Sequence, residues 1–278
     1  MPIITISRGS MSGGTALAEC LSQNLGVPCV GREEVAEKAG ALIGVSPAVV
    51  EEKLMQSPGF WDRITADRRR YVVALQAVLA EHALSGNFVY HGQAGHLLLR
   101  GVPAVLRVRL IAPLEMRVRS LIERHGMRRQ AALDYIKQVD EDRVRWTRQV
   151  YDVDLRDPAL YDLVINLETL SLQSACAVVT EAAGRPEFSI TPEVQAAVED
   201  FALASRVKLA LATHVATRGS VFEVTSKGGA VTVTGVVPEP AMLTHVSSRL
   251  AEEVEGVVRT VAGVAEVRLD LKQFDAYH

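Results

Sequence analysis

The sequence has few cysteines, few aromatic residues and no long apolar run. The three cysteines, Cys20, Cys29 and Cys176, are odd in number and follow no metal-ligand spacing, so we expect no disulfide framework and a reducing compartment. Aromatic residues make up 5% of the chain, which disfavours stacking on single-stranded nucleic acid. No run reaches the roughly 18 apolar residues of a membrane span, and the first residues lack the pattern of a signal peptide. These absences predict a cytoplasmic protein that binds no nucleic acid.

Charge is balanced over the whole chain but uneven along it. The 278 residues carry 30 basic and 33 acidic side chains, and the net charge of −3 implies no polyanionic partner. Residues 100–150 contain twelve basic and six acidic side chains, whereas residues 186–278 contain eight and twelve. A basic feature is therefore confined to the first part of the chain.

Short β-branched runs alternate with helical patterns up to about residue 183. The expected strands are residues 2–7, 88–91, 105–111 and 163–166. The expected helices cover residues 15–25, 33–56 (as two short helices), 62–85, 114–125, 129–150 and 171–183. Strands that alternate with helices favour an α/β fold, with a parallel sheet covered on both faces.

The pattern changes after Gly184. A helix is expected over residues 192–213, strands over 221–225 and 231–235, a helix over 241–257 and a last strand over 264–271. Gly228 and Gly229 lie between two alternating runs, which predicts a hairpin. This α-β-β-α-β order indicates a small α+β module, so we expect two domains, residues 1–185 and 191–273.

The segment from Arg8 to Thr15 is rich in glycine and serine, and it joins the first strand to a helix. Backbone N–H groups in such a loop, together with the positive end of the helix dipole, suit phosphate binding. In the P-loop pattern, Gly13 matches the second glycine and Thr15 the hydroxyl that ligates magnesium, but Arg8 stands for the first glycine and Gly14 for the lysine. The alternative interpretation is a strand-to-helix turn that uses glycine for its geometry.

Arginines at helical spacing form the second feature. Arg117 and Arg124 are seven residues apart, and Arg145 and Arg148 are three apart, so each pair shares a helix face. In a phosphoryl-transfer enzyme, such arginines offset charge on the transferring group. The alternative is a solvated helix face, where acidic neighbours pair with the arginines.

Taken in order, six stretches resemble the cytidylate-kinase-like family of P-loop nucleoside monophosphate kinases. They are Ile3–Gly14, Leu25–Pro28, Val89–Gly92, Val108–Arg117, Asp140–Arg143 and Tyr151–Asn166. The resemblance implies a three-layer kinase-like domain, ATP and Mg²⁺ as cofactors, and a nucleoside monophosphate as acceptor. It implies a phosphate-binding set composed of Arg8, Gly9, Ser10, Ser12, Gly13, Gly14 and Thr15, with Thr15 also on the metal. The same resemblance implies catalytic roles for Arg117, Arg143 and Arg148, and substrate binding by Gly92, Gln93 and Asp140.

The chain also departs from the family pattern. The loop reads Met-Ser-Gly-Gly-Thr where the family commonly has Gly-Ser-Gly-Gly-Arg. Gly31 stands in place of an aspartate, Gln93 stands in place of the arginine of Gly-Arg-Gly, and the strand ending at Ile111 is followed by no carboxylate. Several lost phosphate contacts would weaken catalysis, since one can cost about 10²–10³ in rate.

The second domain resembles a BON domain in two stretches, Gly229–Gly235 and Val261–Val267. That resemblance implies a protein partner, a homo-oligomer or a phospholipid ligand. The net charge of −4 over residues 186–278 argues against anionic lipid, which attracts basic segments, so membrane contact is not favoured. The alternative is a structural appendix that covers part of the first domain.

Three functions follow from these observations. The first is ATP-dependent phosphoryl transfer to CMP, dCMP or a related acceptor. The second is a catalytically weak or inactive nucleotide-binding regulator that signals through the second domain, and a lipid-associated scaffold is a third reading. His91 and His96 flank the Gly92 loop and are additional candidates to line a pocket.

Overall fold

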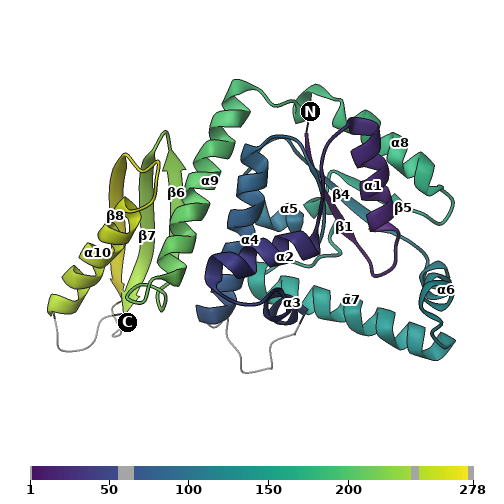
Figure 1. Ribbon diagram of the computed structural model, residues 1–278, viewed down its shortest axis with the longest axis horizontal. Coiled ribbons are helices and arrows are strands. Elements are labelled where there is room, and N and C mark those ends of the chain that lie inside the picture. The colour runs from purple at the N-terminus through teal and green to yellow at the C-terminus, as the bar shows by residue number, and fades with distance from the viewer. Residues whose placement is uncertain (1, 56–65, 239–243, 275–278) are drawn as a thin grey trace.

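A parallel five-stranded sheet forms the centre of the first part of the molecule (Figure 1). The computed structural model describes residues 2–55, 66–238 and 244–274. In sheet order, the strands are β2 (Cys29–Gly31), β3 (Val89–His91), β1 (Ile3–Arg8), β4 (Val105–Ile111) and β5 (Leu163–Asn166). All neighbouring strands are parallel, which confirms the expected α/β sheet. Strand β2 was not expected, because its three residues lie between Pro28 and Arg32 and form no apolar run.

Helices cover both faces of this sheet. Helices α1 (Gly14–Leu25) and α8 (Leu172–Ala183) pack on one face. The other face is covered by α2 (Arg32–Ile43), α3 (Pro47–Met55), α4 (Ala66–Leu84) and the short α5 (Gly95–Leu98). Because successive strand residues point to opposite faces, Ile3 lies in one core and Ile4 in the other. The expected helix over residues 62–85 is seen from Ala66, and its earlier residues lie outside the described ranges.

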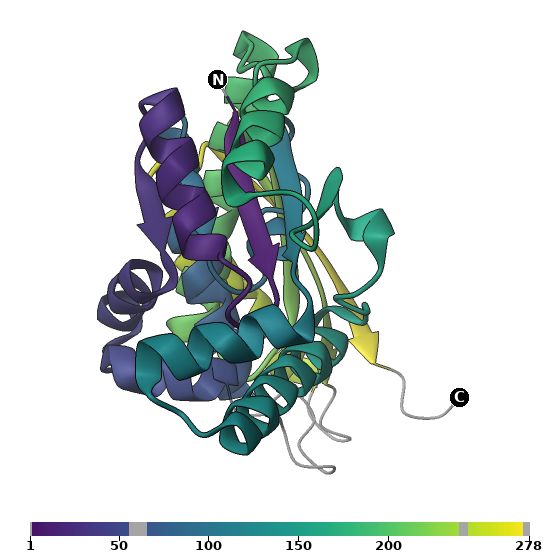
Figure 2. The same ribbon diagram turned by 90° about the vertical axis from the view of Figure 1, so that its right-hand side faces the viewer.

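Two further helices pass beyond the carboxyl ends of the strands, next to the end of β1 (Figure 2). They are α6 (Leu114–His125) and α7 (Arg129–Tyr151). Their contact surface is a small cluster of its own, formed by Val118, Leu121, Ala132 and Ile136. This pairing presents the basic helices to the loop that follows β1. The 3₁₀ turns Pro158–Leu160 and Pro186–Phe188 complete the connections in this part.

The C-terminal part forms a separate mixed sheet of three strands. It comprises α9 (Pro192–Thr213), β6 (Phe222–Lys227), β7 (Ala230–Pro238), α10 (Thr244–Arg259) and β8 (Glu266–Phe274). Strands β6 and β7 are antiparallel, and β7 and β8 are parallel. Gly228 and Gly229 both have positive φ angles in the tight turn, as the hairpin prediction required. The order is the expected α-β-β-α-β, and the likeness to a BON domain stays a prediction.

Helix α9 contributes to two cores at once. Val198 is 1% exposed and lies in the core that contains α4, with Phe201 beside it. Val207 is 0% exposed and lies in the core of the C-terminal sheet. A helix that is apolar on opposite faces is buried on both sides. The division into residues 1–185 and 191–273 therefore stays a prediction, because α9 packs against both parts (Figure 1).

The structure tests two expectations from the sequence, one about disulfides and one about membrane-spanning helices. A disulfide joins Cys20 of α1 to Cys176 of α8, and Cys29 is free. The expectation of no disulfide was wrong because the two helices pack side by side on one face of the sheet, which brings residues 156 positions apart to a Cα–Cα distance of 6.3 Å. Within the described ranges, no helix has the length and apolar character needed to cross a membrane.

Candidate phosphate-binding site

The loop between β1 and α1 has the backbone of a tight turn. Met11 and Gly13 have φ angles of 58° and 81°, in the left-handed region. The Ser12 N–H donates to the Gly9 carbonyl at 3.3 Å, and Gly13 caps α1 without a side-chain hydrogen bond. The first N–H groups of α1 are therefore left for another acceptor, such as a phosphate oxygen.

Arg8 takes the space that a lysine of the usual P-loop would need. A Cβ atom added to Gly14 would lie 2.0 Å from Cδ of Arg8, far inside van der Waals contact. Residue 14 must be glycine while Arg8 keeps this position. The positive charge at the start of α1 is thus supplied from the end of β1.

Arg143 of α7 lies beside Arg8. Its Nη1 donates to the Arg8 carbonyl at 3.3 Å. Burial lowers the pKa of Arg143 to about 10, and the positive charge of Arg8 adds to this effect. Burial also lowers the pKa of Arg8. Guanidinium groups whose pKa values are lowered by burial and by neighbouring cations are stabilised by an anion bound between them.

Asp140 ties the basic helices to the loop. The Ser10 N–H donates to Oδ1 of Asp140 at 2.9 Å, and Arg117 of α6 pairs with Oδ2 of the same carboxylate. Nε of Arg117 also donates to the Ser10 carbonyl at 2.6 Å. The Asp140 carboxylate therefore accepts a hydrogen bond from a backbone N–H of the loop. Backbone N–H groups in such loops are the ones that bind phosphate.

Two cavities meet at these residues. The first, the Gln93 cavity, is small, about 20 Å³. It is lined by Ser7, Arg8, Arg32, Gly92, Gln93, Ala94, Arg143, Thr147 and Leu155. The second, the Asp140 cavity, measures about 120 Å³. It is lined by Arg8, Gly9, Ser12, Arg109, Ile111, Ala112, Arg117, Asp140, Arg143, Val144, Leu155 and Arg156.

Six arginines and one carboxylate line the two cavities together, and Arg8 and Arg143 line both. Such an excess of guanidinium groups favours a ligand with several negative charges. About 20 Å³ in the Gln93 cavity is the room of a single water molecule, so a phosphate group fits only in the larger Asp140 cavity as the structure has it. Arg8 and Arg143, which line both cavities, can both contact a phosphate group bound there.

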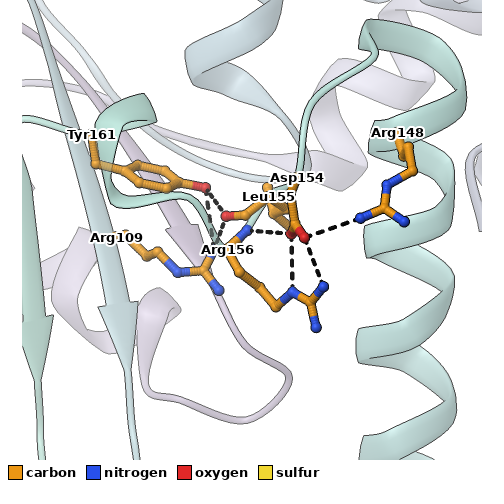
Figure 3. A network of polar contacts seen from close by, with 6 residues as sticks. All are labelled: Arg109, Arg148, Asp154, Leu155, Arg156 and Tyr161. Atoms are coloured by element: carbon orange, nitrogen blue, oxygen red, sulfur yellow. Dashed lines mark hydrogen bonds and ion pairs between the residues drawn. The ribbon is translucent and has the colours of Figure 1, made fainter.

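The wall of the Asp140 cavity is a hydrogen-bonded network (Figure 3). Arg109 donates to the Leu155 carbonyl at 2.7 Å and to the Tyr161 hydroxyl at 3.2 Å. The Tyr161 hydroxyl also lies 3.1 Å from the hydroxyl of Ser7, at the end of β1. These contacts hold Leu155, which lines both cavities, against the sheet.

The structure brings most of the predicted site residues together, but it places Arg148 and Thr15 elsewhere. Arg148 is 61% exposed and pairs with Asp154 at 3.1 Å, outside the lining of both cavities (Figure 3). Asp154 also pairs with Arg156, which does line the Asp140 cavity. Arg148 is therefore placed to position Arg156.

Magnesium has no ready set of ligands here. Thr15 is exposed and lines neither cavity, and Asp140 is already held by Arg117 and Ser10. Among the described residues, no group of three His, Cys, Asp or Glu side chains could hold a metal ion. The carboxylates that magnesium prefers in protein sites are thus missing from the loop.

Three arginines were missed from the sequence. Arg32 follows the unexpected strand β2, Arg109 lies within β4, and Arg156 lies in the loop after α7. A signal for Arg109 was present, since Arg107 and Arg109 alternate with apolar residues and share one face of the strand. Arg32 and Arg156 gave no signal, because neither belongs to a periodic element that was recognised.

A parallel sheet with a glycine loop after its first strand and arginines around it defines a class, the kinase-like α/β proteins that bind nucleotide phosphates. The model of the cytidylate kinase-like family matches residues 3–169. The chain belongs to the cytidylate kinase-like family.

Named relatives agree with this assignment. A protein named cytidylate kinase from Ignicoccus hospitalis is 30% identical over 168 residues, which cover 60% of this chain and 90% of that relative. One of the same name from Methanothrix thermoacetophila is 29% identical over 165 residues, 59% of this chain and 87% of that one. The crystal structure of an uncharacterized protein from Eubacterium ventriosum shares the fold, with a TM-score of 0.53 and 18% identity over 66% of this chain and all of that one.

Proposed function

We propose that the chain transfers the γ-phosphoryl group of ATP to a nucleoside monophosphate, with CMP or dCMP as the favoured acceptor. The observation that carries the proposal is that Arg8 and Arg143 line both cavities, within a member of the cytidylate kinase-like family. The name of the relatives supports the choice of a cytidine acceptor.

In this proposal, the donor phosphates lie on the loop from Gly9 to Gly14. The acceptor phosphate binds beside Arg32 and Gln93, and it requires the Gln93 cavity of about 20 Å³ to widen. Arg32 and Gln93 hold the acceptor phosphate, while Arg117 and Arg143 stabilise the charge on the transferring group. An oxygen of the acceptor phosphate bonds to the γ-phosphorus as its bond to the leaving ADP breaks. Binding of the donor displaces Asp140 from the Ser10 N–H, which then donates to phosphate.

ATP and Mg²⁺ are the partners expected from the family. When bound with ATP, magnesium would neutralise phosphate charge. The carboxylate ligands that magnesium would need are absent from the described site. The arginines are therefore the groups of this chain that neutralise phosphate charge.

The experiment is an ADP-release assay with ATP against CMP, dCMP, UMP and AMP. Turnover with CMP or dCMP above the other acceptors is expected. Absence of turnover above background with every acceptor would overturn the kinase proposal.

A second candidate function is nucleotide-dependent regulation without turnover. The shared helix α9 favours it, since this helix gives the BON-like part a direct contact with the kinase-like core. In this case the BON-like part would bind a protein partner or a second copy of the chain. Calorimetry with ATP, ADP and CMP separates the two functions: binding without turnover supports regulation, and no binding of any nucleotide ends it.

A further inference from the structure

The C-terminal sheet has a free edge at β8. The strand order is β6-β7-β8, and Figure 1 shows β8 on the side of the sheet that faces away from the first part of the molecule. Proteins usually protect an edge strand with a proline, a bulge or a short length. Strand β8 has nine residues, no proline and an unbroken register with β7. Among the described residues, no strand pairs with its outer edge, so this edge can accept a further strand.

The core-facing side chains at the centre of β8 are less buried than those at the centres of the other two strands. Val233 of β7 is 0% exposed and Val224 of β6 is 4% exposed. Val267, Leu269 and Leu271 of β8 face the same core but are only partly buried. A strand added at the β8 edge would cover apolar surface that these side chains still expose to water. The edge at β8, rather than the edge at β6, is therefore the one suited to a partner.

The other face of β8 carries charges that alternate in sign. Glu266, Arg268 and Asp270 are two residues apart, so they lie on one face of the strand, and all three are exposed. Arg268 already pairs with Glu266 at 2.8 Å. Lys272 follows at the same spacing. A row with the order acid, base, acid, base is complementary to the same row read in the opposite direction.

A second copy of β8, running antiparallel, presents this row in the opposite direction. With a two-fold axis at Leu269, Arg268 lies opposite Asp270 of the second copy, and Asp270 lies opposite the second copy's Arg268. The same register places Lys272 opposite Glu266. An axis at Arg268 or at Asp270 would instead place like charges opposite one another, as would parallel pairing in register, and like charges destabilise a sheet. The charge pattern therefore favours a second copy as the partner, in one register.

We propose that two copies of this chain associate through antiparallel pairing of their β8 strands about a two-fold axis at Leu269, which joins their C-terminal sheets into one. On the core side of the strand, this register places Val267 opposite Leu271 and Leu269 opposite its counterpart, so the apolar row continues across the interface. An axis at Val267 or at Leu271 gives only two of the four charged positions an opposite charge across the interface. A two-fold interface uses the same surface on both copies and closes, which produces a dimer. This interface is independent of the proposed kinase activity.

The test measures the association of the full chain by analytical ultracentrifugation over a range of protein concentrations. We expect a monomer–dimer equilibrium. Arg268→Asp sets acidic residues opposite each other in both halves of the interface, and Asp270→Arg sets basic residues opposite each other. Each variant should raise the dimer dissociation constant by about tenfold or more. The matched control Lys227→Asp makes the same change of charge at an exposed residue of β6 and should associate as the unmodified chain does.

An equal mixture of Arg268→Asp and Asp270→Arg tests the register itself. Across a mixed interface, the acidic residues of one variant lie opposite the basic residues of the other. The mixture should therefore dimerise about as tightly as the unmodified chain, although neither variant does so alone. All substituted residues are exposed, and equal circular dichroism should show that each variant is folded. A monomeric chain, unchanged dissociation constants for both single variants, equal weakening by Lys227→Asp, or no gain on mixing would each overturn the proposal.

Discussion

The hollow between α9 and α10 and the two arginine-lined cavities of the first part differ in the balance of charge on their linings. The hollow between α9 and α10 measures about 620 Å³, and its lining carries both signs, with Arg249 against Glu252 and Glu253. The Gln93 and Asp140 cavities measure about 20 and 120 Å³, yet six arginines face one carboxylate there. An excess of arginine over carboxylate, rather than volume, therefore marks the candidate phosphate-binding site.

The same difference holds for the two parts as a whole. The first part keeps arginines buried beside one another, which costs stability unless an anion is bound. In the described residues of the C-terminal part, ion pairs such as Arg259 with Glu255 and Arg268 with Glu266 lie at the surface. We therefore expect substitutions in the first part to change activity, and substitutions in either part to change the free energy of unfolding.

The largest expected effect is on turnover. Replacing Arg143 with glutamine should lower kcat/KM for ATP-dependent phosphorylation of CMP by about 10²–10³-fold, because a donor to the transferring phosphate is lost. ADP release measures the effect, and Arg119→Gln, at an exposed arginine that lines neither arginine-lined cavity, serves as the matched control. Arg148→Gln should cost at most about fivefold, since this exposed residue acts through Asp154 on Arg156. Equal losses for Arg143→Gln and Arg148→Gln would contradict the different roles assigned to them.

The second effect is on the stability of the first part, which alone carries cysteines. Cys20→Ser should lower the free energy of unfolding by about 2–4 kcal/mol, because the disulfide with Cys176 no longer restricts the unfolded chain. Urea denaturation measures this, and Cys29→Ser, at a free cysteine, is the control. A reducing agent should reproduce the loss in the unmodified chain. An unchanged urea midpoint in reducing buffer would show that the disulfide does not form in solution.

The third effect depends on pH. His96 has a folded-state pKa of about 3, below the value of 6.5 expected when it is unfolded. As the pH falls below 6.5, the unfolded chain therefore takes up a proton that the folded chain does not, and stability is lost. The loss from this residue is about 2 kcal/mol between pH 6.5 and pH 5.

His96→Phe should remove this part of the pH dependence of the free energy of unfolding. The control His214→Phe changes an exposed histidine of the C-terminal part and should leave the pH dependence unaltered. Identical pH profiles for His96→Phe and the unmodified chain would show that His96 is accessible to protons in the folded state.

The smallest effect tests whether the two parts unfold together. Val198→Ala and Val207→Ala each remove two buried methyl groups from opposite faces of α9. Each should lower the free energy of unfolding by about 1–2 kcal/mol. In calorimetry, both should shift one common transition, because α9 belongs to both cores. Two separate transitions, each moved by only one variant, would show that the parts unfold independently.

Much of the fold could be predicted from the sequence because its elements are long and regular. Helix 129–150 and strand 105–111 matched α7 and β4 almost residue for residue, and the Gly228-Gly229 hairpin has the positive φ angles it required. Strand β2 and helix α5 were missed because neither has an apolar run long enough to show a period, whereas β3, also three residues long, follows the apolar Phe88. Such short elements form through their neighbours in the sheet and core, which one sequence does not display.

The site could be predicted in part. The loop and Arg143 were recognisable from motif and resemblance, but Arg32 reaches the Gln93 cavity only because β2 pairs beside β3. The disulfide was missed for the same reason, since contact between α1 and α8 depends on tertiary packing. Contacts between residues of separate elements depend on how the elements pack, and the sequence of either element alone does not predict them.

Helix α9 restricts how this protein can be altered or recombined. Helix α9 packs in two hydrophobic cores. Replacing it with the equivalent helix of another protein would therefore leave a cavity in one of them. The natural seam for exchanging the C-terminal sheet lies after α9, in residues 214–221, rather than at Gly184, where the sequence pattern changes. A graft made there keeps Val198 and Phe201 on α4, so the nucleotide-binding part retains its own interior. The foreign sheet must then pack on the face of α9 that carries Val207.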